Sequence, residues 1–88
     1  MIRRRAVVHG RVQGVFFRDT TRRRAESLGV AGWVSNRRDG AVEAVFEGAP
    51  AAVETMIALC REGPPGAHVE AVEVREEPEE GAEGFRIR

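Results

Sequence analysis

The order in which the hydrophobic period changes along this chain is the feature that most constrains its fold. Apolar residues alternate with a period of two over Arg5–Val12, and a helical stripe follows over Arg18–Leu28. Two alternating segments, a second helical stripe and a final alternating region complete the 88 residues. Because strands repeat every two residues and helices every 3.6, this order predicts β-α-β-β-α-β with a short extra strand.

Turn residues set the predicted boundaries. Gly29 ends the first helix, and Asp39-Gly40 is a strong signal for a hairpin. The other elements are expected as strands Gly32–Asn36 and Ala41–Gly48, a helix from Pro50 with Val53, Met56, Ile57 and Cys60 on its apolar face and Gly63-Pro64-Pro65-Gly66 after it, and strands Val69–Arg75 and Gly84–Arg88. Along Val69–Arg75 the apolar phase changes, which predicts a bulge or a bend.

These elements predict an α+β fold of the ferredoxin-like, split βαβ type, with two helices on one face of an antiparallel sheet. A chain of 88 residues has room for one hydrophobic core, so a single domain over residues 1–88 is expected. The same fold supports many unrelated activities, and it therefore indicates little about chemistry.

Charge is distributed unevenly along the sequence. Residues 1–40 hold ten Arg and three acidic residues, whereas residues 41–88 hold four Arg and eleven Glu. Such asymmetry indicates either an anionic partner on one side of the molecule or two halves whose charges interleave in the fold. The chain lacks Lys, and Gln13 and Asn36 are its only side-chain amides.

The composition also bears on location. No apolar run is long enough to span a membrane, and no apolar stretch of signal-peptide length follows Met1. The lone Cys60 cannot form an internal disulfide, which is typical of a reducing compartment. We therefore expect a cytoplasmic protein with no membrane partner, and we expect it to be a monomer.

The first candidate site is the glycine-containing segment Gly10–Arg18 between a strand and a helix. Backbone N–H groups in such a loop, beside a helix N-terminus, can converge on a phosphate, and Arg18 can add a bidentate donor. Two glycines four residues apart are also common in simple turns. We expect Phe16 and Phe17 to be core anchors.

Asn36, beside the predicted hairpin, is the second candidate. An amide can donate and accept at once, as orienting a water requires, but a residue at this place is usually part of the turn. Conventional catalytic sets are absent, because the chain has only two histidines and Cys60 lies on an apolar helical stripe. No metal and no cofactor are expected.

Two segments together resemble the signatures of the acylphosphatase family. Val8–Arg18, read as VHGRVQGVFFR, resembles the first, and Gly32–Asn36, read as GWVSN and followed by Gly40-Ala41-Val42 and Gly48, resembles the second. The resemblance extends from about residue 5 to the C-terminus. Ser35 departs from the longer side chains that the family tends to carry there.

The resemblance implies hydrolysis of acyl phosphates to a carboxylate and inorganic phosphate. The backbone N–H groups of Gln13, Gly14, Val15, Phe16, Phe17 and Arg18 would bind the phosphate. The Arg18 guanidinium would bind it as well, and Asn36 would hold the attacking water. Some relatives also place the C-terminal carboxylate against the arginine, which would put the end of Phe85–Arg88 near Arg18.

Two other functions remain open at this point. Arginine clusters on a ferredoxin-like sheet are compatible with an RNA-binding module, but the strand Ala41–Gly48 offers only Phe46 for base stacking, so no nucleic-acid partner is expected. The second alternative is a module that binds phosphate or carbamoyl phosphate without turnover, as related domains do within larger proteins.

Overall fold

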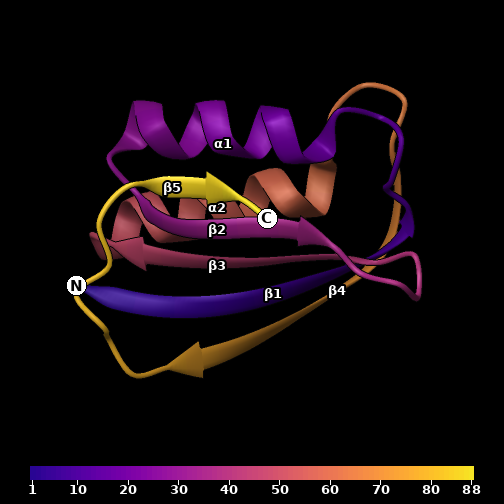
Figure 1. Cartoon of the computed structure of the whole chain (residues 1–88). Helices are drawn as coiled ribbons and strands as arrows, with labels where there is room; N and C mark the ends of the chain where they lie inside the picture. The colour runs from indigo at the N-terminus through magenta and orange to yellow at the C-terminus, as the bar shows by residue number, and fades with distance from the viewer.

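Strands and helices follow one another in the predicted order. The computed structural model describes residues 1–88 (Figure 1). Its elements are β1 (Ile2–Arg11), α1 (Phe17–Leu28), β2 (Ala31–Asn36), β3 (Val42–Gly48), α2 (Pro50–Glu62), β4 (His68–Glu77) and β5 (Phe85–Ile87). β1 begins three residues before the predicted Arg5. The reason is that Arg3 and Arg4 lie in the strand with their guanidinium groups paired to glutamates, which alternation of apolar residues does not reveal.

The five strands form one sheet in the order β4-β1-β3-β2-β5. β1 pairs with β3 and β4, and β2 pairs with β3, all antiparallel. β5, the short extra strand, pairs with β2 in parallel, so the sheet is mixed and not purely antiparallel. The segment after β4 crosses the end of the sheet and brings β5 to the opposite edge (Figure 1). The ferredoxin-like fold is confirmed, with this one change at the edge.

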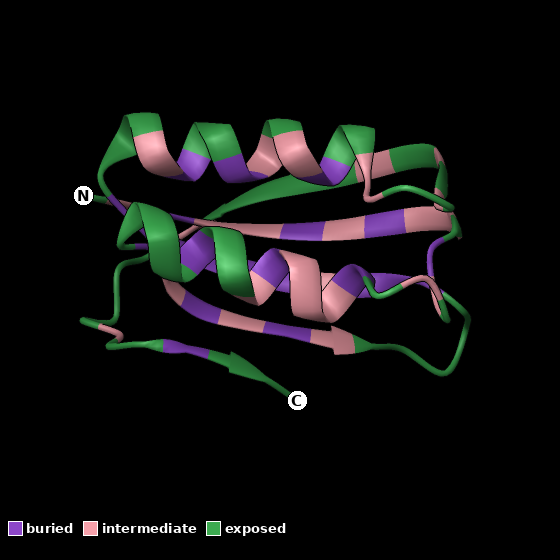
Figure 2. Ribbon diagram, turned by 90° about the horizontal axis from the view of Figure 1, so that it is seen from above, coloured by how far each residue is buried: buried purple, intermediate pink, exposed green.

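Both helices cover the same face of the sheet, and the core lies between them and the strands (Figure 2). Strand residues Ala6, Val8, Val34, Val42, Ala44, Phe46 and Phe85 meet helix residues Phe17, Ala25, Val53, Met56 and Cys60 there. The predicted stripe of α2 is confirmed. On α1 the stripe is formed by Phe17, Thr21 and Ala25, whereas Leu28 is exposed. Neither helix is both long and apolar enough to cross a membrane.

The predicted irregularity in the fourth strand is a β-bulge. Ala71 pairs with His9 and Val69 with Gly10, so Glu70 is an extra residue without a partner in β1. Gly10 has φ of 128°, and a Cβ at this position would lie 2.2 Å from the His68 carbonyl oxygen. Gly10 is therefore required by the close approach of β4, and not by the loop that follows.

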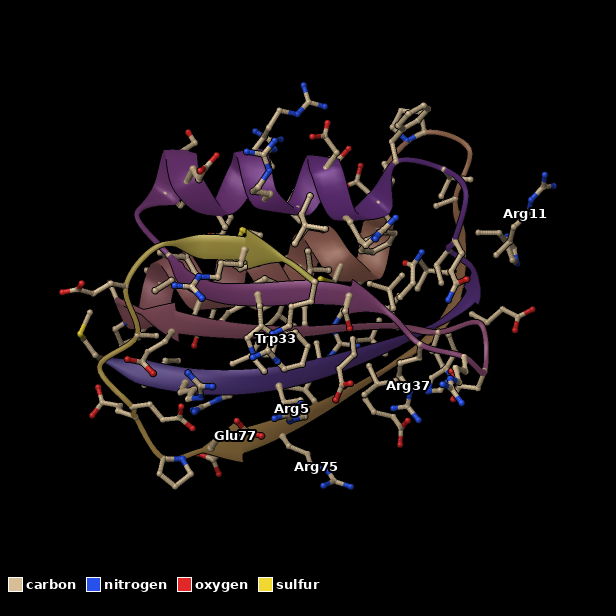
Figure 3. All side chains as sticks on the ribbon, viewed as in Figure 1. Arg5, Arg11, Trp33, Arg37, Arg75 and Glu77 are labelled. Carbon is tan, nitrogen blue, oxygen red and sulfur yellow. The ribbon has the colours of Figure 1, made fainter.

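The face of the sheet without helices carries paired charges. Arg3 is 5% exposed, and its Nη1 donates to Oε1 of Glu47, which is 3% exposed, at 3.0 Å. Arg5 pairs with Glu43 and Glu77 and lies over the Trp33 ring at 5.3 Å (Figure 3). The arginines of β1 thus meet the glutamates of β3 and β4. In this region the two halves of the sequence interleave their charges, as one of the two interpretations predicted.

Candidate active site

A cavity of about 320 Å³ lies where the β1–α1 loop meets the ends of β2 and β5. Its lining consists of Val12, Gly14, Phe16, Phe17, Arg18, Asp19, Asn36 and Ile87. Arg18 and Asn36 are separate in the sequence and reach this cavity from α1 and β2. The fold therefore brings together the two side chains that the sequence analysis singled out.

The backbone N–H groups beside this cavity are free. None from Gln13 to Asp19 donates to a backbone carbonyl, and the first bond of α1 runs from the Thr20 N–H to the Phe16 carbonyl oxygen at 3.0 Å. The backbone N–H groups that donate to side chains are those of Ala41, Glu80 and Ala82, which lie elsewhere. The loop and the N-terminus of α1 thus present a row of free donors, the arrangement that binds anions in proteins.

Phe16 holds the loop in an uncommon conformation. It has φ of 61° and ψ of 27°, and it is the one non-glycine residue with positive φ. This left-handed region costs a bulky residue about 1–2 kcal/mol, and such strain concentrates at functional sites. Phe17 is a core anchor, as predicted, but the prediction for Phe16 is wrong, because its side chain is 80% exposed. The left-handed turn directs Phe16 outward while Phe17 enters the core.

The Gln13 side chain connects the loop to the β2–β3 hairpin. Its Nε2 donates to the carbonyl oxygens of Arg37 at 2.7 Å and Ala41 at 3.0 Å. The hairpin carries Asn36 at the end of β2, so this amide sets the loop and Asn36 at a defined separation. The family resemblance implied only a backbone role for Gln13. The scarcity of amides in the chain was the available signal for its side chain.

Asn36 takes no part in the hairpin turn. Oδ1 of Asp39 accepts the Ala41 N–H at 3.0 Å, and Gly40 adopts φ of 94°. That N–H, together with Arg37, keeps the pKa of Asp39 below its usual range. The Asn36 amide makes no hydrogen bond within the protein and lines the cavity. The turn is therefore built by its neighbours, and the Asn36 side chain stays available.

Arg18 lies in the first turn of α1 without an ionic partner. The adjacent Asp19 pairs with Arg22 at 3.1 Å and Arg23 at 3.2 Å. The C-terminal carboxylate forms no ion pair with Arg18, contrary to what the resemblance implied. The guanidinium of Arg88 instead lies 4.4 Å from the Trp33 ring centroid, and Ile87 lines the cavity. Arg18 thus keeps its donors for a ligand.

The other chemically reactive side chains lie away from the cavity. Cys60 is in the core, and burial raises the pKa of its thiol to about 12, so the thiolate does not form at neutral pH. His9 contacts Glu73 at 2.7 Å on the outer surface, and His68 is exposed in β4. No three His, Cys, Asp or Glu side chains come together as a possible metal-binding group.

Similarity to known proteins covers almost the whole chain. A sequence profile of acylphosphatases matches residues 4–87. The chain is 64% identical over 85 residues to an acylphosphatase of Rubrobacter xylanophilus. This match covers 96% of this chain and 77% of the relative. A crystal structure of acylphosphatase from Bacillus subtilis superposes with a TM-score of 0.96 at 38% identity, covering 100% of this chain and 99% of that one.

The fold also matches part of a larger protein. Full-length HypF in its phosphate- and nucleotide-bound form contains a region that superposes with a TM-score of 0.88 at 29% identity, covering 100% of this chain and 12% of HypF. The sequence profile covers nearly all of the chain, and the relatives of similar length carry the same family name. This chain belongs to the acylphosphatase family.

Proposed function

We propose that this protein hydrolyses acyl phosphates to a carboxylate and inorganic phosphate. The observation that carries the proposal is that Arg18 and Asn36 line one cavity beside a row of free backbone N–H groups. The N–H groups from Gln13 to Arg18 and the Arg18 guanidinium bind the phosphoryl oxygens. Asn36 orients the attacking water: its Oδ1 accepts a hydrogen bond from the water, while its N–H group donates to the water oxygen or to the phosphate.

The reaction needs little more than these groups. Water attacks phosphorus, the bond from phosphorus to the acyl oxygen breaks, and the electron pair leaves with the carboxylate while the proton of the water passes to solvent. A carboxylate is a good leaving group, so no strong base is required. Catalysis then consists of positioning the water and stabilising charge on the phosphoryl oxygens, which preorganised N–H groups and a guanidinium can do.

We propose further that residues 1–88 act as one monomeric domain, without metal or cofactor, in the cytoplasm. The buried and unpaired Cys60 supports a reducing compartment. An RNA partner is disfavoured by the aromatic side chains. Phe46 lies in the core, and both Arg5 and Arg88 lie against the Trp33 ring, which leaves no free aromatic surface on the central strands for base stacking.

A binding module without turnover is the alternative that the likeness to part of HypF keeps in view. The decisive experiment is hydrolysis of acetyl phosphate by the purified protein after exhaustive chelation. Full activity supports the proposed reaction. Activity that disappears with the chelator and returns with a divalent ion would contradict the mechanism, and phosphate binding without any turnover would favour the module.

Replacing Asn36 separates binding from chemistry. Asn36→Ala should lower turnover by at least ~10²-fold, the usual scale for losing one preorganised group, and leave inhibition by inorganic phosphate nearly unchanged. Ser35→Ala is the matched control, because Ser35 is one residue away and lies on the opposite face of β2, opposite Glu43. Near-normal turnover in Asn36→Ala would refute the water-positioning role.

A further inference from the structure

Two of the exposed large apolar side chains in this molecule line the same cavity as Arg18 and Asn36. The exposed large hydrophobic residues are Met1, Phe16, Leu28, Val74 and Ile87. Of these, Phe16 and Ile87 line the cavity, at 80% and 40% exposure. They come from distant parts of the chain, the β1–α1 loop and β5. Two water-exposed apolar groups that line the same cavity as Arg18 and Asn36 call for a functional explanation.

The backbone is fixed at both residues. Phe16 is directed outward by its left-handed conformation, which the loop maintains at a cost in strain. Ile87 pairs with Val34 of β2, and the following Arg88 N–H donates to the Val34 carbonyl oxygen at 2.9 Å. The stacking of Arg88 on Trp33 fixes the same edge. The backbone positions from which the two apolar groups reach the cavity are therefore preformed.

The charges around the cavity indicate which acyl groups can be bound there. Arg18 is the cation that lines it, and the proposed function uses Arg18 for the phosphoryl group. The only carboxylate in the lining, Asp19, is paired with Arg22 and Arg23, so neither of these arginines is a free cation for the acyl group. An acyl portion that extends from the phosphate thus meets apolar groups and no free cation.

Building on the proposed function, we propose that Phe16 and Ile87 form a binding site for the acyl group. The site selects acyl phosphates whose acyl group is uncharged and apolar, with aromatic acyl groups favoured over acetyl. An aromatic ring that contacts these two side chains would remove more apolar surface from water than an acetyl methyl group can.

A second hollow beside Phe16 is an alternative place for the acyl group. On its other side, Phe16 borders a depression of about 430 Å³ whose lining includes Val15, Pro64 and Pro65. An acyl group bound there would contact Phe16 but not Ile87. The two arrangements therefore predict different effects of substitutions at Ile87 and Pro65.

The experiment compares kcat/KM for benzoyl phosphate with kcat/KM for acetyl phosphate. The wild-type ratio should favour benzoyl phosphate, and Phe16→Ala and Ile87→Ala should each lower this ratio, by roughly tenfold for Phe16 and several-fold for Ile87. Val74→Ala is the control, because Val74 is about as exposed as Ile87 but lies on β4 and does not line the cavity. Inhibition by inorganic phosphate, measured in each variant, reports separately on the phosphate site.

Each outcome is decisive. A ratio unchanged within twofold in both variants, with both compounds hydrolysed, would overturn the acyl site and leave the proposed function intact. A ratio that responds to Phe16→Ala and Pro65→Ala but not to Ile87→Ala would place the acyl group in the other hollow and also overturn it. Absence of turnover of either compound by the wild type would refute the proposed function and this site with it. Should Ile87→Ala fail to fold, Ile87→Thr retains the branched β-carbon and serves instead.

Discussion

The two junctions at which a strand passes into a helix differ sharply, although the fold repeats the same arrangement. Between β1 and α1, residues 12–16 form a loop with Gly14 and the strained Phe16, and the N–H groups beyond it are free. Between β3 and α2, Ala49 alone connects the elements, and Pro50 occupies the first turn. Neither helix has a side-chain cap. A short connection that uses proline removes a donor, whereas the longer loop exposes several.

The charged residues near the two junctions also differ: the one at the first junction is free, and the one at the second is fully paired. Arg18 follows the first junction and has no ionic partner. Glu47 comes just before the second, and it accepts hydrogen bonds from Arg3 and from the N–H groups of Glu80 and Ala82. Topology thus provides two helix N-termini at opposite ends of the sheet (Figure 1), and local sequence decides which one can bind an anion.

The largest expected effect comes from removing the free cation. Arg18→Ala should reduce turnover by at least about 10³-fold and abolish inhibition by phosphate, because the guanidinium binds the phosphoryl group before and during reaction. Arg18→Lys should also fail, since a point charge cannot replace the bidentate donor. Arg61→Ala, in the last turn of α2, is the control and should keep normal kinetics. Phosphate inhibition that survives in Arg18→Ala would contradict the assignment.

Substituting two glycines of similar backbone conformation, one in the loop and one outside it, distinguishes an effect on the phosphate-binding loop from an effect on stability. Gly14 and Gly29 have φ of 77° and 69°, and neither has atoms within 4 Å of an added Cβ. Alanine at either position should therefore cost a similar ~1 kcal/mol of unfolding free energy. Only Gly14→Ala should also weaken phosphate inhibition and lower turnover, by roughly tenfold, because it reorients N–H groups of the loop. Equal kinetics in the two variants, measured beside urea denaturation, would show that the loop N–H groups do not bind phosphate.

Glu47→Gln tests the structural charge at the second junction. The Glu80 N–H and the Arg3 guanidinium lower the pKa of Glu47 from its ordinary value of about 4.5. A lowered pKa means that ionised Glu47 stabilises the fold above that pH and that the contribution is lost as the pH falls below it. Thermal melts from pH 7 to 2 should show a Tm about 10 °C lower at pH 7 in Glu47→Gln and a smaller further loss in acid. Turnover at pH 7 should stay normal, and a fall in turnover by the folded variant would link Glu47 to the site.

The smallest effect is expected at Pro50. Pro50→Ala should lower the unfolding free energy by no more than ~1 kcal/mol, because proline at this position mainly restricts the unfolded chain. Kinetic constants should not change. Altered phosphate inhibition in this variant, measured beside chemical denaturation, would show that the two junctions are not as independent as their positions indicate.

Local pattern was sufficient for much of this molecule. The spacing of apolar residues, two in strands and 3.6 in helices, predicted every strand and helix to within a few residues, since it reports backbone conformation and which side chains share a face. The change of phase in Val69–Arg75 predicted a bulge or a bend, because one extra residue shifts every later side chain to the other face. The structure has a bulge there, at Glu70. The two glycine-bearing signatures singled out Arg18 and Asn36.

What the sequence alone could not decide involves contacts between distant segments. It did not reveal that β5 joins β2 in parallel, because the alternation of apolar residues does not specify at which edge of the sheet a strand lies. Nor did it separate Phe16 from Phe17, since a left-handed conformation at a phenylalanine has no signature in hydrophobicity. The Gln13 bonds to the hairpin and the arrival of Ile87 at the cavity also depend on tertiary packing. Sequence by itself determined the elements and the reactive side chains, and tertiary structure decided which of them meet, because pairing and packing act between residues far apart in the chain.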